Sequence, residues 1–111
     1  MSSRVCVIIP TVDNSTELAV VLDGLSKQTF QEVVVAVVGP AEDPGKQVTE
    51  ERGFRYIDDK GSRNRADACN VAIRETESEL VFFTDDDVIV PRDWIEKLER
   101  RLLERVLTKP V

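Results

Sequence analysis

Hydrophobic residues form short unbroken runs along this chain, separated by segments of helical spacing. Val5–Ile9 and Val33–Val38 are continuous and rich in β-branched residues, and turn residues close both runs. Such runs are typical of strands buried on both faces of a parallel sheet. Shorter runs at Phe54–Ile57 and Leu80–Thr84 predict a third and a fourth strand.

The segments between these runs predict helices. Apolar residues at positions i, i+3, i+4 and i+7 indicate a helix over about Ser15–Lys27, and Asn14 stands three residues before Glu17, the spacing of a capping box. A weaker helical segment is expected from Asp43-Pro-Gly to about Arg52.

Two further helices are expected in the second half of the chain. One follows Asp58–Gly61 and carries a face of small residues, including Ala68 and Ala72, that suits close packing on a sheet. The other is expected over about Asp93–Leu107, and Pro91 is expected to start its first turn. Its apolar residues exceed a single stripe: Trp94, Ile95, Leu98, Leu102, Leu103, Val106 and Leu107.

Strands and helices alternate, which predicts an α/β fold built on an open, mostly parallel sheet with helices on both faces. The length of 111 residues is enough for one core, so residues 1–111 are expected to form a single domain. We find no internal repeat or linker.

Charge and hydropathy narrow the possible partners. The net charge is −6, from 15 basic and 21 acidic residues, so the basic surface expected of a nucleic-acid-binding protein is missing. The longest apolar runs are far shorter than the ~20 residues of a membrane span, and residues 1–4 do not begin a signal peptide. We expect a cytoplasmic protein, either free or at a membrane surface.

Cysteine and histidine content constrain the chemistry. Cys6 and Cys69 lack the spacing of a zinc or redox pair and are expected to be reduced, packed thiols. The chain has no histidine, so any reaction must depend on carboxylates, Arg, Lys or backbone groups.

Candidate chemistry lies where the predicted strands end, because open α/β sheets bind ligands at the carboxyl ends of their strands. Asp85-Asp86-Asp87 directly follows the fourth strand. Three adjacent carboxylates repel one another unless a cation or strong donors compensate. Oxygen ligands without Cys or His point to Mg²⁺ or Mn²⁺. The alternative is that the triplet is a solvated turn.

Asp58-Asp59 follows the third strand, and clustered aspartates in a chain of this length raise the alternative of a phospho-acceptor receiver domain. Such a domain needs its acidic pair after the first strand and a Lys after a fifth strand, neither of which is present. Asp58–Gly61 is therefore more simply predicted to be a turn, with a functional role kept open.

Taken together, these segments resemble family 2 glycosyltransferases of the GT-A (Rossmann-like) fold. The resemblance runs from about Val5 to Leu98 and rests on Pro10-Thr11, on Lys27–Phe30, on Asn64–Ile73 and on Glu79–Asp87 with Pro91, Asp93 and Trp94. Asn70 stands 15 residues before Asp85, as it does in that family's pattern before the D-x-D motif. The resemblance implies a domain that binds a nucleotide-diphosphate sugar, with a UDP-sugar favoured, for transfer to an unknown acceptor.

The resemblance also implies a role for each matching residue. Donor-binding positions would be Pro10, Thr11, Asp13, Arg63, Arg65, Asn70, Asp85 and Asp86. Mg²⁺ or Mn²⁺ would be held by Asp87 with Asp85. Solvated or structural roles remain open for both arginines and for Asn70.

This chain departs from the family's pattern in two places. Gly39-Pro40 stands where family members commonly carry an acidic pair after the second strand, and no residue corresponds to the general base of the acceptor-binding half. No catalytic residue is assigned, and a non-catalytic nucleotide-binding or structural module is the alternative reading. The apolar C-terminal helix predicts self-association or docking on a partner subunit.

Overall fold

The computed structural model describes residues 3–29 and 32–108, in which strands and helices alternate. The strands are β1 (Ser3–Pro10), β2 (Val33–Gly39), β3 (Arg55–Asp58) and β4 (Ser78–Phe83). The helices are α1 (Ser15–Ser26), α2 (Gly45–Glu51), α3 (Arg65–Glu75) and α4 (Trp94–Thr108).

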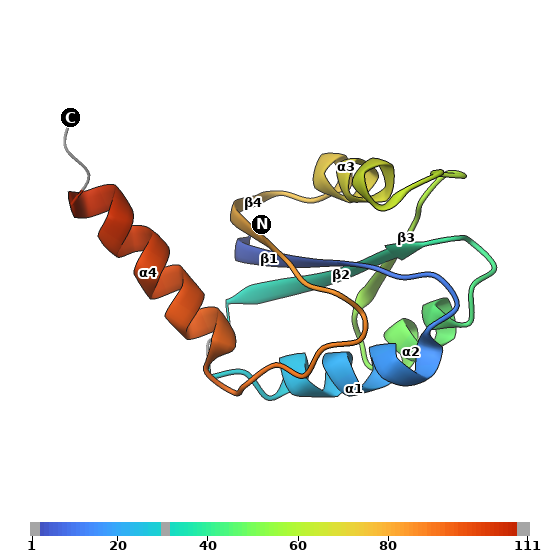
Figure 1. The fold of residues 1–111 in the computed structure, drawn as a ribbon, viewed down its shortest axis with the longest axis horizontal. Coiled ribbons are helices and arrows are strands. Elements are labelled where there is room, and N and C mark those ends of the chain that lie inside the picture. The colour runs from blue at the N-terminus through green and yellow to red at the C-terminus, as the bar shows by residue number, and fades with distance from the viewer. Residues whose placement is uncertain (1–2, 30–31, 109–111) are drawn as a thin grey trace.

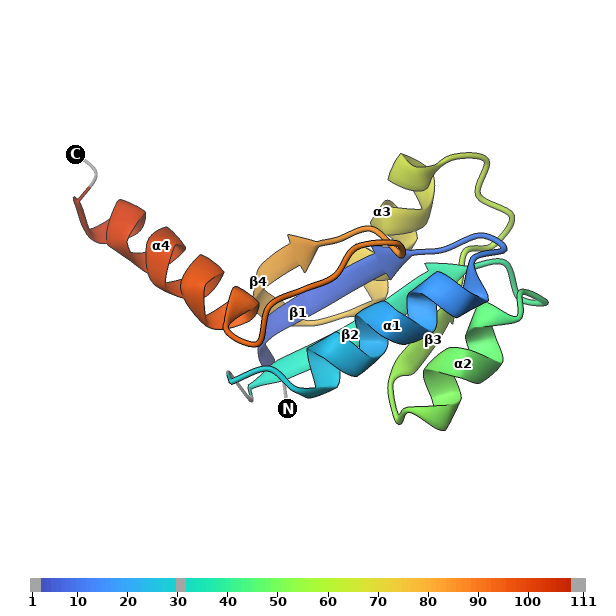
Figure 2. The same ribbon diagram turned by 60° about the horizontal axis from the view of Figure 1, so that its bottom comes forward.

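The four strands form one parallel sheet in the order β3-β2-β1-β4. Helices α1 and α2 cover one face of this sheet and α3 covers the other, as Figures 1 and 2 show. The predicted α/β class, with a parallel sheet and helices on both faces, is confirmed. Because all the strands are parallel, their carboxyl ends lie along one edge of the sheet.

Strand β1 is the centre of the hydrophobic core, and its five residues from Val5 to Ile9 have no solvent exposure. Because side chains alternate along a strand, Val5, Val7 and Ile9 pack under α1, whereas Cys6 and Ile8 pack under α3. The continuous apolar run in the sequence reflects this burial on two faces.

The α3 face depends on small side chains, as predicted. Ala68 and Ala72 are buried against β1 and β2, which lets the helix lie close to the strands. Cys6 and Cys69 are free thiols on this face, and burial raises the pKa of both.

The helix starts differ from the sequence prediction in one respect. Asn14 precedes α1 as expected, but its side chain makes no capping hydrogen bond. The side-chain cap is found instead at α3, where Asn64 Oδ1 accepts a hydrogen bond from the backbone of Asp67 at 2.9 Å. Asn14 thus occupies the N-cap position of α1 without a side-chain cap, and its side-chain amide donates to another loop, as described below.

Helix α4 begins later than predicted. Pro91 does not lie in its first turn but three residues before it, in a turn closed by the backbone hydrogen bond from Trp94 to Pro91 at 3.1 Å. From there α4 projects beyond the sheet, as Figure 1 shows. Side chains 102–108, which include the last four residues of the predicted apolar stripe, lie outside those that the structure describes.

A buried glutamine fixes the segment between β4 and α4. Gln28, at the end of α1, is 2% exposed. Its Nε2 donates to the carbonyl of Pro91 at 2.6 Å, and its Oε1 accepts from the backbone N–H of Ile95 at 3.0 Å. Val90 and Ile95 also join the core under α1. The loop that carries the aspartate triplet is thus anchored at its far end.

Within residues 3–29 and 32–108, no helix combines the length and the apolar character needed to cross a bilayer.

Replacing this glutamine tests the anchor. Gln28→Met should lower the free energy of unfolding by about 2–4 kcal/mol, because it leaves the Pro91 carbonyl and the Ile95 N–H buried without their partner. Thr29→Val is the matched control: it removes an exposed hydrogen bond to Glu96 and should change stability by less than about 1 kcal/mol. Urea denaturation measures both, and equal effects would contradict the anchoring role.

Candidate functional site

Polar residues from three strand ends surround a pocket of about 300 Å³ at the carboxyl edge of the sheet. The loop after β1 contributes Pro10 and Thr11, and the loop after β4 contributes Asp86. Asp59 lines it from the end of β3, and the segment leading into α3 adds Arg63 and Arg65 among others. The structure therefore brings together five of the predicted donor-binding residues and adds Asp59.

Asp86 joins the loop after β4 to the loop after β1. Thr11 Oγ1 donates to Asp86 Oδ2 at 2.8 Å, and Asn14 Nδ2 donates to Asp86 Oδ1 at 3.1 Å. Thr11 is 3% exposed, so its hydroxyl makes this hydrogen bond largely shielded from water. These two donors hold the aspartate triplet against the end of β1.

Asp85 forms an ion pair with Arg65 at the start of α3. The pair is half exposed, with 58% of the Arg65 side chain and 45% of the Asp85 side chain open to solvent. An exposed pair of this kind adds little to stability. Little free energy is therefore needed to separate Arg65 from Asp85. Arg65 lines the pocket, so its guanidinium group is available to bind an anionic ligand there.

Asp87 is exposed and does not line the pocket. Across the part of the chain that the structure describes, no three acidic or cysteine side chains are grouped closely enough to enclose a metal ion. The triplet thus divides into an ion-paired, a hydrogen-bonded and a solvent-facing carboxylate.

Three predicted donor-binding residues are not part of the pocket lining: Asp85, described above, Asp13 and Asn70. Asp13 has a left-handed backbone (φ 52°), and its N–H donates to Asp43 Oδ2 at 2.7 Å, which ties the loop after β1 to the loop after β2. Asn70 is exposed and lines a separate hollow on α3 together with Lys60, Asp67 and Arg74.

The turn predicted at Asp58–Gly61 is present. The Asp59 carboxylate accepts from the backbone of Gly61 at 3.0 Å, and Lys60 and Gly61 both have left-handed backbones. Asp59 is nevertheless 6% exposed, whereas Asp58 is exposed. The position of Asp59 after the third predicted strand is the feature of the sequence that pointed to a role in the site. Which member of an acidic pair is buried cannot be inferred from residue spacing.

The end of β2 offers no room for a side chain. A Cβ atom on Gly39 would lie 2.5 Å from the Thr11 carbonyl oxygen and 2.6 Å from the Tyr56 hydroxyl. That hydroxyl donates to the Pro40 carbonyl at 2.7 Å. Residue 39 is therefore restricted to glycine by its neighbours.

Open α/β sheets bind their ligands at the carboxyl ends of the strands, which is where this pocket and the aspartate triplet lie. The family model for glycosyl transferase family 2 matches residues 6–107, so the chain belongs to this family. The resemblance stated from the sequence is confirmed.

Solved structures of glycosyltransferases share the fold. TarS from S. aureus, solved with UDP-GlcNAc, is 24% identical with a TM-score of 0.75, over 93% of this chain and 32% of that one. The mannosyltransferase PcManGT from Pyrobaculum calidifontis, in complex with GDP-Man and Mn²⁺, is 25% identical with a TM-score of 0.73, over 83% of this chain and 30% of that one.

A third similar structure is glucosyl-3-phosphoglycerate synthase from Mycobacterium tuberculosis, solved with Mn²⁺, UDP and glucosyl-3-phosphoglycerate. It is 18% identical with a TM-score of 0.73, over 96% of this chain and 40% of that one. The chain thus spans well under half the length of these three proteins. No curated protein sequence matches it significantly.

Tyr56 provides a titration test of the site. Burial and then the nearby carboxylates, Asp43 foremost, raise the pKa of Tyr56 above its usual value of 10.0. Tyr56 is the single tyrosine of the chain, so tyrosinate absorbance reports on it alone. We expect a midpoint above 10.0, lowered in Asp43→Asn and unchanged in Asp23→Asn on the distant, exposed side of α1.

The same shift sets the sign of the pH dependence. The unfolded chain ionises Tyr56 at lower pH than the folded chain, so this contribution to stability is fully present below about pH 10 and is lost as pH rises toward the folded pKa. A tyrosinate midpoint at or below 10.0 in the folded protein would contradict the geometry around Tyr56.

Proposed function

We propose that the pocket binds the nucleotide of a nucleotide-diphosphate sugar, and that the sugar is transferred from it to an acceptor. The observation that carries the proposal is the meeting of Asp85 and Asp86 with Arg63 and Arg65 at the carboxyl edge of a family 2 sheet. The guanidinium groups suit a diphosphate, and the carboxylates suit hydroxyl groups and a cation.

Each matching residue has a part in this proposal. Pro10, Thr11 and Asp13 frame the base and ribose from the loop after β1. Arg63 and Arg65 contact the phosphates, and Asp85 and Asp86 lie near the ribose and the sugar. Asn70 lies outside the pocket, so we assign it no contact with the nucleotide.

The carboxylates fit a divalent cation of the Mg²⁺ or Mn²⁺ type. Such ions usually bind through one or two carboxylates and complete their shell with water and substrate phosphates, so a closed protein cage is not required. Asp87 is exposed and Asp85 is held only by a half-exposed ion pair, so both could turn toward the ion. When bound, the cation would neutralise charge on the departing nucleoside diphosphate.

The neighbours support two different donors. TarS was solved with UDP-GlcNAc and PcManGT with GDP-Man and Mn²⁺. We assign no general base or acceptor. A module that holds the nucleotide without transferring the sugar is the second candidate, since the residues that line the pocket account for holding a nucleotide and not for activating an acceptor.

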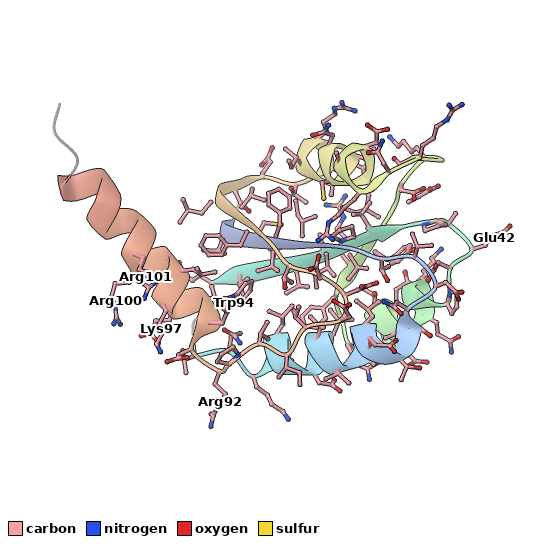
Figure 3. All side chains as sticks on the ribbon, in the orientation of Figure 1. Glu42, Arg92, Trp94, Lys97, Arg100 and Arg101 are labelled. Atoms are coloured by element: carbon pink, nitrogen blue, oxygen red, sulfur yellow. The ribbon has the colours of Figure 1, made fainter. Side chains whose placement is uncertain are left out.

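Asp87→Asn tests the proposal. Titration calorimetry with GDP and UDP should show binding that is strengthened by Mn²⁺ in the parent protein, and this Mn²⁺ effect should fall about tenfold or more in the variant because a charged ligand is lost. Glu42→Gln is the matched control, since it removes one exposed carboxylate from the loop after β2, outside the pocket that Asp86 lines (Figure 3). No binding of either nucleotide at millimolar concentration would refute the proposal.

We further propose that α4 meets a second copy or a partner subunit. Trp94 packs edge-on against Phe82 with ring centroids 6.4 Å apart, and Ile95 is buried where α4 meets the body. Beyond these residues the helix leaves the sheet, and Figure 3 shows Lys97 and Arg100 directed away from it. Leu98 lies on the same helix and is half-buried.

Light scattering over a range of concentrations checks this surface. The apparent mass should rise with concentration, and Leu98→Glu should weaken that rise because a charge enters an apolar contact. Lys97→Glu, on the exposed side of the helix, should leave it largely unchanged. A constant monomer mass at all concentrations would argue against association through α4.

A further inference from the structure

Asp43, in the loop after β2, uses both of its carboxylate oxygens to bind backbone groups. Its Oδ1 accepts a hydrogen bond from the N–H of Gly45 at 2.8 Å, at the start of α2. Its Oδ2 accepts from the N–H of Asp13 at 2.7 Å, across 30 residues of sequence. Asp43 is half-buried and does not line the pocket at the carboxyl edge of the sheet. It therefore joins two loops without belonging to the ligand site itself.

The loop that Asp43 holds contains a constrained turn. Residues 11–14 connect β1 to α1, and within them Asp13 has a left-handed backbone with φ 52°. A residue with a Cβ atom adopts this conformation at a cost in free energy, although aspartate tolerates it better than most. A hydrogen bond from the Asp13 N–H to a charged acceptor offsets that cost. The left-handed turn at residue 13 therefore depends on Asp43.

The residues on either side of this turn hold the aspartate triplet. Thr11 Oγ1 and Asn14 Nδ2 donate to the two oxygens of Asp86. The backbone of Thr11 is fixed by the sheet, because its N–H donates to the Val38 carbonyl at 2.9 Å. Asn14 lies on the far side of the turn, so a change of backbone conformation at residue 13 moves Asn14 relative to Thr11. One oxygen of Asp86 would then lose its donor.

Asp43 is itself held in place by its surroundings. Its N–H donates to the Pro40 carbonyl at 3.1 Å, which closes a turn after β2. The start of α2 packs closely here, since a Cβ atom on Gly45 would lie 3.0 Å from Asp43 Oδ1 and 3.2 Å from Thr11 Cγ2. Figure 1 shows the loops after β1 and β2 at the same end of the sheet. Asp43 is thus a fixed point to which the loop after β1 is attached.

We propose that Asp43 is a positioning residue for the nucleotide site. By fixing the turn at Asp13 it sets the place of Asn14, and Asn14 in turn holds Asp86 at the wall of the pocket. The affinity for a nucleotide with its cation then depends on a carboxylate that contacts neither of them. This inference rests on the proposed function, because it needs a nucleotide in the pocket.

Asp43→Ala tests the positioning role, because it removes both acceptors and leaves the residues that line the pocket unchanged. The measurement is calorimetric titration of GDP and UDP at a fixed Mn²⁺ concentration. The variant should bind the nucleotide that the parent protein prefers about five- to tenfold more weakly, which is roughly the effect of losing one hydrogen bond to a charged group.

Two control variants separate this role from general effects. Glu42→Gln removes a neighbouring exposed charge. Thr49→Val removes the buried hydrogen bond from the Thr49 hydroxyl to the Gly45 carbonyl at 2.7 Å, so it weakens α2 without a change in the loop after β1. Urea denaturation should show that Thr49→Val is less stable than the parent protein. Both controls should keep the nucleotide affinity within about twofold, since an exposed charge is screened by solvent and α2 lies outside the pocket.

An equal loss of affinity in Asp43→Ala and in either control would overturn the positioning role. Equality with Glu42→Gln would show a general effect of charge, and equality with Thr49→Val would show a general effect of α2 stability.

A double-mutant cycle tests the route through Asn14. Asn14→Ala should lower the nucleotide affinity by itself, because Asn14 lines the pocket and holds Asp86. In that background, Asp43→Ala should lower the affinity further by less than about twofold, since the contact through which Asp43 acts is already absent. Losses that add fully in the double variant would contradict this route.

A measurement without nucleotide reports on the same contact. The side-chain amide of Asn14 gives an NMR signal that is identified by its absence from the spectrum of Asn14→Ala. In Asp43→Ala this signal should move toward that of a solvated asparagine, because the hydrogen bond to Asp86 is lost, and it should stay in place in both controls.

The outcomes distinguish this inference from the function on which it rests. An unchanged Asn14 signal or an unchanged affinity in Asp43→Ala would overturn the role of Asp43 and leave the nucleotide site intact. A parent protein that binds neither nucleotide would instead refute the proposed function, and this inference with it.

Discussion

The burial of β1 on both faces is the constraint on which the rest of this structure depends. Five consecutive residues without solvent exposure can be satisfied only between two helical layers, with a strand hydrogen-bonded on each side. The parallel pairing with β2 and β4 then brings the loops after these strands to one edge. The pocket is a consequence of how the hydrophobic core is closed.

At that edge, acidic residues have two different uses. Asp86 and Asp43 accept hydrogen bonds from neighbouring loops, and they hold the loops after β1, β2 and β4 in fixed relation. Asp87 and Asp85 keep their carboxylates accessible to solvent or in an exposed ion pair. The net negative charge of the chain is therefore partly structural, because a carboxylate accepts several backbone and side-chain donors at once.

Patterning predicted the strands, the helices and the parallel sheet, because runs such as Val33–Val38 and small-residue faces such as that of α3 are direct consequences of burial. The strand-end rule placed Thr11 and Asp86 near one site, and the family resemblance added Arg65. Patterning placed Asn14 correctly before α1 but missed that the Asn14 side chain bonds Asp86, 72 residues away, in place of a cap, and it gave no reason to separate Asp59 from Asp58. Long-range hydrogen bonds and burial within an acidic pair leave no local periodicity to detect.

The contact at Gly39 has a consequence for how this site can vary. Residue 39 can gain a side chain only if residue 56 becomes smaller and the loop at Thr11 moves outward, so these positions are structurally coupled. Among natural variants of this domain, a side chain at residue 39 should therefore be accompanied by a smaller residue at 56. Several simultaneous replacements are needed to open this strand end, and single-step divergence at residue 39 is blocked.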